Sequence, residues 1–194
     1  MRVVTAAILL LLLAGPAHAM EWRLGVAYAS GLSDVTDLYE DNLRNAGFDV
    51  NVDLKFPLGL AASFVYDWPS GMRADVGLGP TFLIGGDIEH VEVPLTGTIG
   101  YNFTPEEAWT PYVRAGIVHH FASGDQYSSS TPGLFAAVGI DFTHVSFEIA
   151  IDRSEVEFDR LVCDAGGGDC ELTKTDLNTY EVLAAVYWRF RLFR

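Results

Sequence analysis

The chain has 194 residues, of which 49% are hydrophobic and 20% are charged, and its formal net charge is −14. Its longest uncharged apolar run covers residues 6–14, which is too short for a bilayer-spanning helix of about 20 residues. A helical membrane protein is therefore excluded. The 12% of aromatic residues exclude a disordered chain, and the excess of acid argues against nucleic-acid binding.

The first 19 residues predict a secretory signal peptide. Arg2 supplies the positive start, residues 6–14 the apolar stretch, and Ala17, His18 and Ala19 the small-x-small cleavage site. We therefore expect a single mature domain over residues 20–194, with 11 basic and 26 acidic residues and a net charge of −15.

Export would place the two cysteines in an oxidising compartment. Cys163 and Cys170 are separated by Asp-Ala-Gly-Gly-Gly-Asp, a spacing that we interpret as a small disulfide loop. A metal site is the weaker alternative, because no histidine or further cysteine lies nearby.

From residue 21 onward, apolar residues recur at every second position, which is the period of a β-strand. In chain order, the alternating runs cover residues 22–28, 48–68, 74–82, 91–103, 113–121, 134–142, 145–151 and 180–192. Pro57 and Gly59 mark a bend within the second run, because the parity continues across them. Most runs suit transmembrane strands of about 9–11 residues better than soluble strands of about 5–6.

These runs predict an all-β fold, an eight-stranded antiparallel up-and-down transmembrane barrel. The longer connections 31–46, 84–89, 122–132 and 153–177 would face outward, and the shorter ones, 69–71, 104–109 and 143–144, the periplasm. The spacing between Ser33 and Gly47 predicts a short surface helix, and residues 48–56 should project beyond the membrane. The acidic segment 153–177 has no calcium-loop pattern, so bridging by divalent cations is only a hypothesis.

The two faces of the predicted strands differ in charge. One parity is uncharged, and the other carries acids and bases that we expect to pair inside the barrel: Arg23, Asp53, Lys55, Asp67, Arg73, Asp75, Glu92, Arg114, Asp141, Glu148, Asp152, Glu181, Arg189 and Arg191. An eight-stranded interior is just wide enough to be filled by side chains, so these residues should lock the barrel rather than line a channel.

Aromatic residues gather at the strand ends beside the short connections, as in the girdles of membrane barrels. The predicted girdle consists of Trp22, Tyr66, Trp68, Tyr101, Phe103, Trp109, Phe142, Phe147, Trp188 and Phe190.

Several features point to one family: the signal peptide, the eight runs, Tyr101-Asn102-Phe103, the segment 111–116 (Pro-Tyr-Val-Arg-Ala-Gly) and the aromatic last strand. Together they resemble the small outer-membrane β-barrel proteins of the OmpA transmembrane-domain, OmpX and OmpW type. The resemblance implies a monomer in the Gram-negative outer membrane, in contact with lipid and lipopolysaccharide. It also implies assembly by the barrel assembly machinery through the C-terminal strand, although Phe193 is followed here by Arg194.

We expect a structural or surface-interaction role, with the acidic outer loops facing a partner and no cofactor. Three alternatives stay open: a narrow pore for small solutes, an enzyme acting on outer-leaflet lipid, and a secreted lipocalin-like carrier with the two faces reversed. For the enzyme, His119, His120, Ser123 and Asp125 form the only suggestive group, but their spacing predicts rim polar residues and not a catalytic triad.

Overall fold

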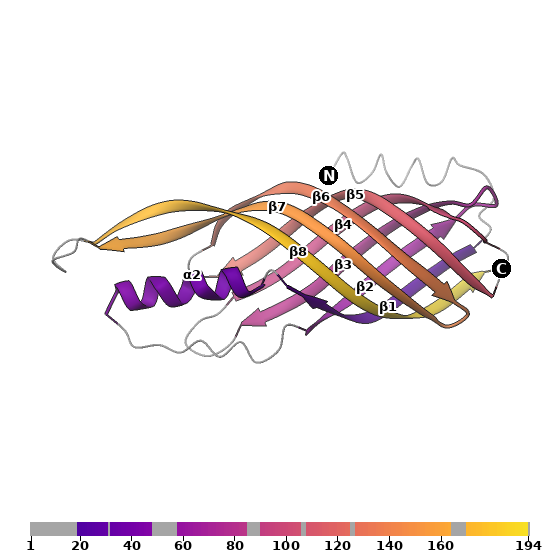
Figure 1. The fold of residues 1–194 in the computed structure, drawn as a ribbon, viewed down its shortest axis with the longest axis horizontal. Helices are drawn as coiled ribbons and strands as arrows, with labels where there is room; N and C mark the ends of the chain where they lie inside the picture. Colours follow the sequence, from indigo (N-terminus) through magenta and orange to yellow (C-terminus); the bar gives the residue numbers. More distant parts are fainter. Residues whose placement is uncertain are drawn as a thin grey trace.

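The computed structural model describes residues 19–30, 32–47, 58–84, 90–105, 108–124, 127–163 and 170–193. Within them, eight antiparallel strands close into a barrel in which β1 pairs with β8 and every other strand with its neighbours in sequence (Figure 1). The predicted eight-stranded antiparallel barrel is therefore confirmed. Residues 1–18 of the predicted signal peptide lie outside the described residues.

The strands follow the alternating runs of the sequence. They are β1 (Ala19–Ala29), β2 (Leu58–Asp67), β3 (Met72–Ile84), β4 (His90–Asn102), β5 (Trp109–Gly124), β6 (Tyr127–Phe142), β7 (Val145–Cys163) and β8 (Cys170–Phe193). The predicted helix is present as α2 (Leu32–Asn45). No helix among the described residues is long and apolar enough to cross a membrane.

The two ends of the barrel differ. One end, the turn end, carries the short connections β2–β3, β4–β5 and β6–β7 together with the start of β1 and the end of β8 (Figure 1). At the other, the hairpin end, β7 and β8 extend far beyond the remaining strands, and α2 lies beside them. The hairpin end is therefore the end that carries the largest structures beyond the barrel wall.

Two predicted loops are wrong. Most of residues 122–132 belong to β5 and β6, and most of residues 153–177 belong to β7 and β8. The second predicted strand, 48–68, is described only from Leu58, so Asp53 and Lys55 lie outside the described residues.

A reversal of polarity explains the missed extension of β7. Up to Ile151, which is 56% exposed, the outward positions are apolar, but the next outward positions are Arg153 and Glu155, also exposed. The inward positions change in the opposite sense, because Val156 and Phe158 are fully buried. The alternation therefore continues through residues 153–158 with its two faces exchanged.

Close approach of neighbouring strands limits substitution at one glycine. A Cβ atom on Gly116 would clash with the backbone oxygen of Gly97, whereas a Cβ on Gly97 would meet no atom within 4 Å. We expect Gly116→Ala to lower the free energy of unfolding by about 1–3 kcal/mol, the usual effect of overpacking. Gly97→Ala is the matched control and should leave the urea midpoint of the refolded barrel unchanged. Equal midpoints for the two variants would contradict the close approach.

Candidate functional site

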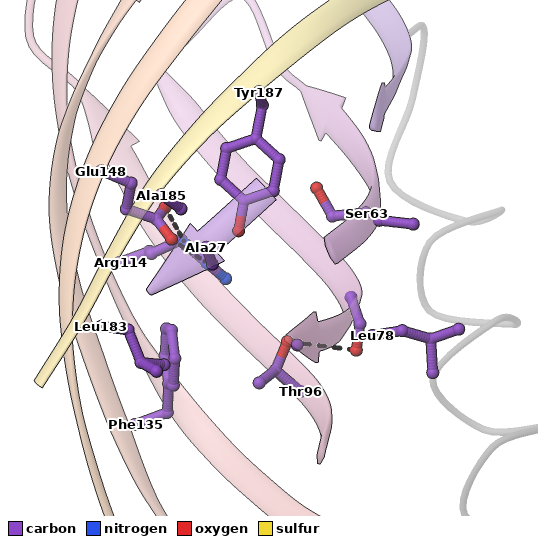
Figure 2. Close-up of a pocket in the computed structure, with 13 residues that line it drawn as sticks. Ala27, Ser63, Leu78, Thr96, Arg114, Phe135, Glu148, Leu183, Ala185 and Tyr187 are labelled. Atoms are coloured by element: carbon purple, nitrogen blue, oxygen red, sulfur yellow. Dashed lines mark hydrogen bonds and ion pairs between the residues drawn. The ribbon is translucent and has the colours of Figure 1, made fainter. Parts of the chain in front are cut away.

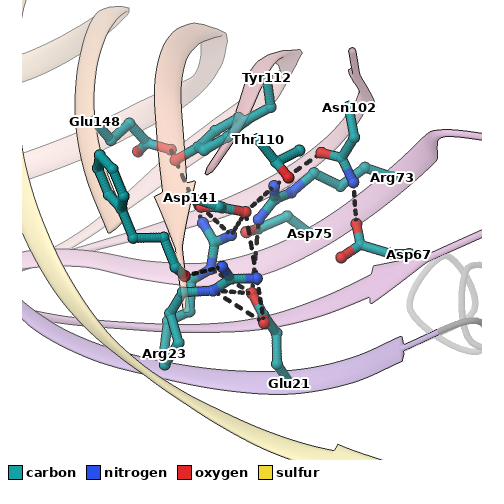
Figure 3. A network of polar contacts seen from close by, with 12 residues as sticks. Glu21, Arg23, Asp67, Arg73, Asp75, Asn102, Thr110, Tyr112, Asp141 and Glu148 are labelled. Atoms are coloured by element: carbon teal, nitrogen blue, oxygen red, sulfur yellow. Dashed lines mark hydrogen bonds and ion pairs between the residues drawn. The ribbon is translucent and has the colours of Figure 1, made fainter. Parts of the chain in front are cut away.

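The barrel interior near the turn end holds a dense network of charged side chains (Figure 3). Asp141 on β6 is its centre, because both carboxylate oxygens accept from Arg23 Nη2, at 2.8 and 2.7 Å. Arg73 Nη1 donates to the same carboxylate from β3 at 2.9 Å. One acid thus ties together side chains from three strands that are not neighbours in the sheet.

Glu21 extends this network along β1. It accepts from Arg23 Nε at 2.9 Å and from Arg189 Nη2, on β8, at 2.6 Å. Arg189 also donates through Nη1 to the backbone oxygen of Phe142 at 2.5 Å. The ion pairs therefore span the seam between β1 and β8 where the barrel closes.

A second group of charges lies deeper in the barrel, around Arg114. Its guanidinium binds Glu148 in a bidentate manner, with Nε and Nη2 at 2.7 and 2.6 Å from the two carboxylate oxygens. Nη1 donates to Asp75 at 3.2 Å and to Thr98 at 3.1 Å. Bidentate pairs of this kind are among the strongest and most directional side-chain contacts.

Tyr112 joins the two groups. Its hydroxyl donates to Glu148 at 2.8 Å, and its ring lies 4.1 Å from the guanidinium carbon of Arg73 and 5.3 Å from that of Arg23. A guanidinium over the face of an aromatic ring is attracted by the negative charge of that face. Close by, Arg73 also donates to Asn102, whose amide donates in turn to Asp67 at 2.8 Å (Figure 3).

Further from the turn end than these charged groups, the interior becomes apolar and tightly filled. Small side chains from β1, β2 and β8 meet there (Ala27, Ala61 and Ala185), and Phe135 and Leu183 are 4% and 6% exposed. The cavity drawn in Figure 2 is lined in part by Arg114, Glu148 and Tyr187 and has a volume of about 20 Å³. A cavity of this size holds about one water molecule.

A third polar group lies nearer the hairpin end, around His120. Its Nδ1 is in hydrogen-bonding contact with Glu92 on β4, and its Nε2 lies 2.7 Å from Asp152 on β7. All three residues are at most 4% exposed. Two ionised carboxylates accept from one histidine only when both ring nitrogens carry protons, so the arrangement suits an imidazolium. Glu181, also buried, faces Asp152 across the β7–β8 ladder.

Most of the predicted interior charges are placed inside the barrel. Those with buried side chains are Arg23, Asp67, Arg73, Asp75, Glu92, Arg114, Asp141, Glu148, Asp152, Glu181 and Arg189. Arg191 is different: it is exposed, because it lies close to the end of β8, opposite the irregularity between Met20 and Glu21.

Four interior residues were missed by sequence reasoning. Glu21 shares the parity of Arg23 and is fully buried, so extending that run by one step would have found it. Tyr112 and Asn102 were missed because only charged residues were sought on the inward parity. His120 was assigned to the rim, and it is oriented by Glu92 and Asp152, acids from strands far away in sequence.

The predicted aromatic girdle lies outside the barrel, towards the turn end. Trp22, Tyr101, Phe103, Trp109, Phe142, Phe147, Trp188 and Phe190 are 41% to 55% exposed, and Tyr66 and Trp68 are half-buried. Several pack edge to face across or along strands, including Trp22 with Phe64 at 5.1 Å and Tyr66 with Trp68 at 4.6 Å. Flat amphipathic rings at a common level are what a membrane interface favours.

Neither a catalytic nor a metal site is visible in the described part of the chain. The side chain of His120 is held by carboxylates, and His119 points outward against the edge of Phe121 at 4.6 Å. Ser123 is exposed, and Asp125 lies outside the described residues. Among those that are described, no group of three or more His, Cys, Asp or Glu side chains has the arrangement of a metal site.

The disulfide loop can be assessed from the strand register alone. Cys163 and Cys170 are directly opposite each other in the β7–β8 ladder. Opposite residues in antiparallel strands have Cα atoms about 4.5–5.5 Å apart, which is within the range that a disulfide requires. The bond itself stays a prediction.

We expect protein isolated from an oxidising compartment to carry this disulfide. Without reductant, neither cysteine should react with maleimide in the denatured chain, and both should react after reduction. Mass spectrometry of the labelled peptides is the measurement. Labelling before reduction would contradict the pairing.

No protein-family model matches the sequence, and no curated protein does. Among solved structures, the chain is similar to the outer membrane protein OprG from Pseudomonas aeruginosa, with 15% identity and a TM-score of 0.53 over 91% of this chain and 98% of that one. Neisserial surface protein A (NspA) is 15% identical, with a TM-score of 0.48 over 91% and 100% of the two chains. AlkL is 13% identical, with a TM-score of 0.46 over 93% and 95%. At these identities, the likeness to OprG supports the fold.

Proposed function

We propose that the chain is an integral protein of the bacterial outer membrane with a closed interior and a surface-interaction role. The observation that carries the proposal is the distribution of polarity. Large apolar side chains cover the outside, with Leu24, Val138 and Ile149 each more than half exposed, while charged residues fill the inside. Exposure of such an apolar band to water is unfavourable, whereas its contact with lipid is favourable.

The hairpin end would face the outside of the cell. Outer-membrane barrels have short periplasmic connections and longer outer ones, and the turn end carries the short ones here. The change from Ile151 to Arg153 on the outside of β7 marks where lipid gives way to water and lipopolysaccharide head groups. β8, with its aromatic end, would then be the strand that the assembly machinery recognises, as the resemblance to the OmpA, OmpX and OmpW type implies.

A closed interior distinguishes this proposal from a solute pore. Buried ion pairs cross the barrel interior near the turn end, and packed alanines and Phe135 fill the interior further towards the hairpin end. The same arrangement argues against a lipocalin-like carrier, because a carrier would need its apolar parity on the inside. The interior therefore holds the barrel together, and the hairpin end is left as the surface that meets partners.

Fractionation and conductance test the proposal together. The protein should be found in the detergent-extracted outer membrane and migrate differently on gels when boiled. In a planar bilayer, it should give no stable conductance steps. A periplasmic, heat-insensitive protein would contradict the membrane assignment, and large stable steps would contradict the closed interior.

A further inference from the structure

Strand β7 continues beyond the barrel wall along an edge that β6 does not reach. β6 begins at Tyr127, which pairs with Phe158, whereas β7 continues to Cys163. On its other edge, β7 pairs with β8 throughout this stretch, up to Cys163 and Cys170. The backbone groups of residues 159–163 that point away from β8 must therefore be satisfied by something other than β6.

Helix α2 supplies partners for this edge. The side-chain amide of Asn42 donates to the backbone oxygen of Asp159 at 2.9 Å and accepts from the backbone nitrogen of Leu161 at 3.1 Å. Asn45 donates to the backbone oxygen of Leu161 at 3.1 Å. Asn42 is 4% exposed, so its amide makes these bonds away from bulk water. The helix lies alongside the hairpin and packs against β7 (Figure 1).

The chemistry of these contacts is that of an added strand. A side-chain amide carries the same donor and acceptor as a peptide group, and Asn42 uses both on the β7 backbone. Asn42 and Asn45 are three residues apart, so they lie on one face of the helix. Asparagine is a poorer helix former than alanine, so helix formation does not account for two of them in this turn. Pairing with the strand does account for them.

The end of α2 is built so that its last turn lies at the strand. The N–H of Ala46 donates to the oxygen of Asn42, and the N–H of Gly47 donates to the oxygen of Arg44, both at 3.0 Å. Gly47 has a φ of 85°, the left-handed conformation that ends many helices and that glycine adopts most readily. The two asparagines are therefore held in an ordered turn.

We propose that α2 is a strap that occupies the β7 edge and prevents this edge from pairing with the β7 edge of a second copy of the chain. An uncovered strand edge is a template for pairing, and covering it with a helix is one way in which natural sheets avoid association. Two copies carry the same edge, so a twofold contact would use it twice. The strap keeps the protein monomeric whichever way the hairpin end faces, so a failed fractionation would leave this inference untouched.

Hydrogen exchange of the Leu161 amide tests the strap directly. In the refolded protein in detergent micelles, Asn42→Ala should accelerate the exchange of this amide about tenfold, because its acceptor is lost. Asn45→Ala keeps that acceptor and should leave the rate close to that of the wild type. Amide-resolved NMR is the measurement. Equal rates in the two variants would overturn the role assigned to Asn42.

Light scattering coupled to size-exclusion chromatography tests what the strap prevents. The wild type should be a monomer in detergent micelles, and Asn42→Ala combined with Asn45→Ala should form dimers and larger species as its concentration rises. Arg44→Ala is the control, because this exposed side chain pairs with Glu40 on its own helix, and it should stay monomeric. An associated wild type, or a monomeric double variant with fast Leu161 exchange, would overturn the proposal.

A proline in the strand identifies the surface through which the double variant associates. The N–H of Leu161 points towards α2 and away from β8, so Leu161→Pro removes a donor from the edge alone. Proline is tolerated on edge strands and blocks their pairing. Added to the double variant, it should restore the monomer. Association that persists with the proline would show that another surface is responsible and would overturn the edge contact.

Heat-dependent gel migration checks that each variant contains a folded barrel. The replaced side chains lie beyond the barrel wall, so the shift on boiling should be unchanged. If the double variant does not refold, Asn42→Ala alone decides the same question, since it removes both bonds of the buried amide. It should associate to a smaller extent than the double variant, and a monomer with fast Leu161 exchange would again overturn the proposal.

Discussion

Replacing Asp141 with alanine is expected to lower the free energy of unfolding of the barrel by about 3–5 kcal/mol. Asp141 is the shared acceptor of Arg23 and Arg73, and Arg189 lies 3.5 Å from it. Its removal leaves buried guanidinium groups without their principal counter-charge. Breaking a buried ion pair from one side costs more than the pair contributes, because the remaining charge stays desolvated.

Urea unfolding of the refolded protein in lipid vesicles, followed by tryptophan fluorescence, is the measurement. Asp176→Ala removes an exposed carboxylate from the hairpin and serves as the control, with an expected change within about 0.5 kcal/mol. If the two variants unfolded at the same urea concentration, Asp141 would not be the centre of the network.

The barrel fold could be predicted because residues that face lipid and residues that face the interior alternate along each strand of a membrane barrel. Val113 and Ile117 face outward on β5, and Arg114 faces inward between them. A one-residue shift would exchange the faces, so the register of each strand is strongly specified by the pattern itself. The strand count and the inward charges follow from the same alternation.

The same method failed where the surroundings of the barrel change. It identified strands by apolar residues at every second, outward-facing position, and on β7 the last such residue is Ile151. Beyond this point Val156 and Phe158 are buried on the inward side, and the outward positions Arg153 and Glu155 are charged and exposed. A search for alternation of either sign would have extended β7 as far as Phe158. The extension of β7 and β8 beyond the barrel wall was therefore missed.

The partners of the interior residues were beyond prediction for a different reason. Parity states which side chains point inward but not how strands are shifted along one another. His120 meets Glu92 and Asp152, which are 28 and 32 residues away in sequence, only because of the stagger around the closed barrel. Arg23 and Asp141 are separated by 118 residues. Such contacts depend on the shear of the barrel, which cannot be deduced from the sequence of any single strand.

The interior changes in character along the axis, and each level has its own task. Near the turn end, arginines and acids from many strands fix the wall. Further towards the hairpin end, the small side chains of Ala27, Ala61 and Ala185 pack together with Tyr187. Nearer the hairpin end, the group around His120 links β4, β5 and β7 below the point where the hairpin leaves the wall.

Replacing His120 with phenylalanine is expected to lower the free energy of unfolding by about 3–5 kcal/mol. An aromatic ring is kept at this position, but Glu92 and Asp152 lose the charge that offsets theirs. One carboxylate oxygen of Asp152 has no hydrogen-bond partner among the described residues, and the other oxygen contacts the ring of His120. Nearby Glu181 adds a third buried carboxyl group.

His119→Phe, on the outer face of the same strand, keeps the buried group intact and is the matched control, with an expected change within about 0.5 kcal/mol. Urea unfolding of the refolded protein in lipid vesicles is the measurement. Equal urea midpoints for the two variants would show that Glu92 and Asp152 do not depend on His120, because their only difference is which side chain of the strand has been replaced.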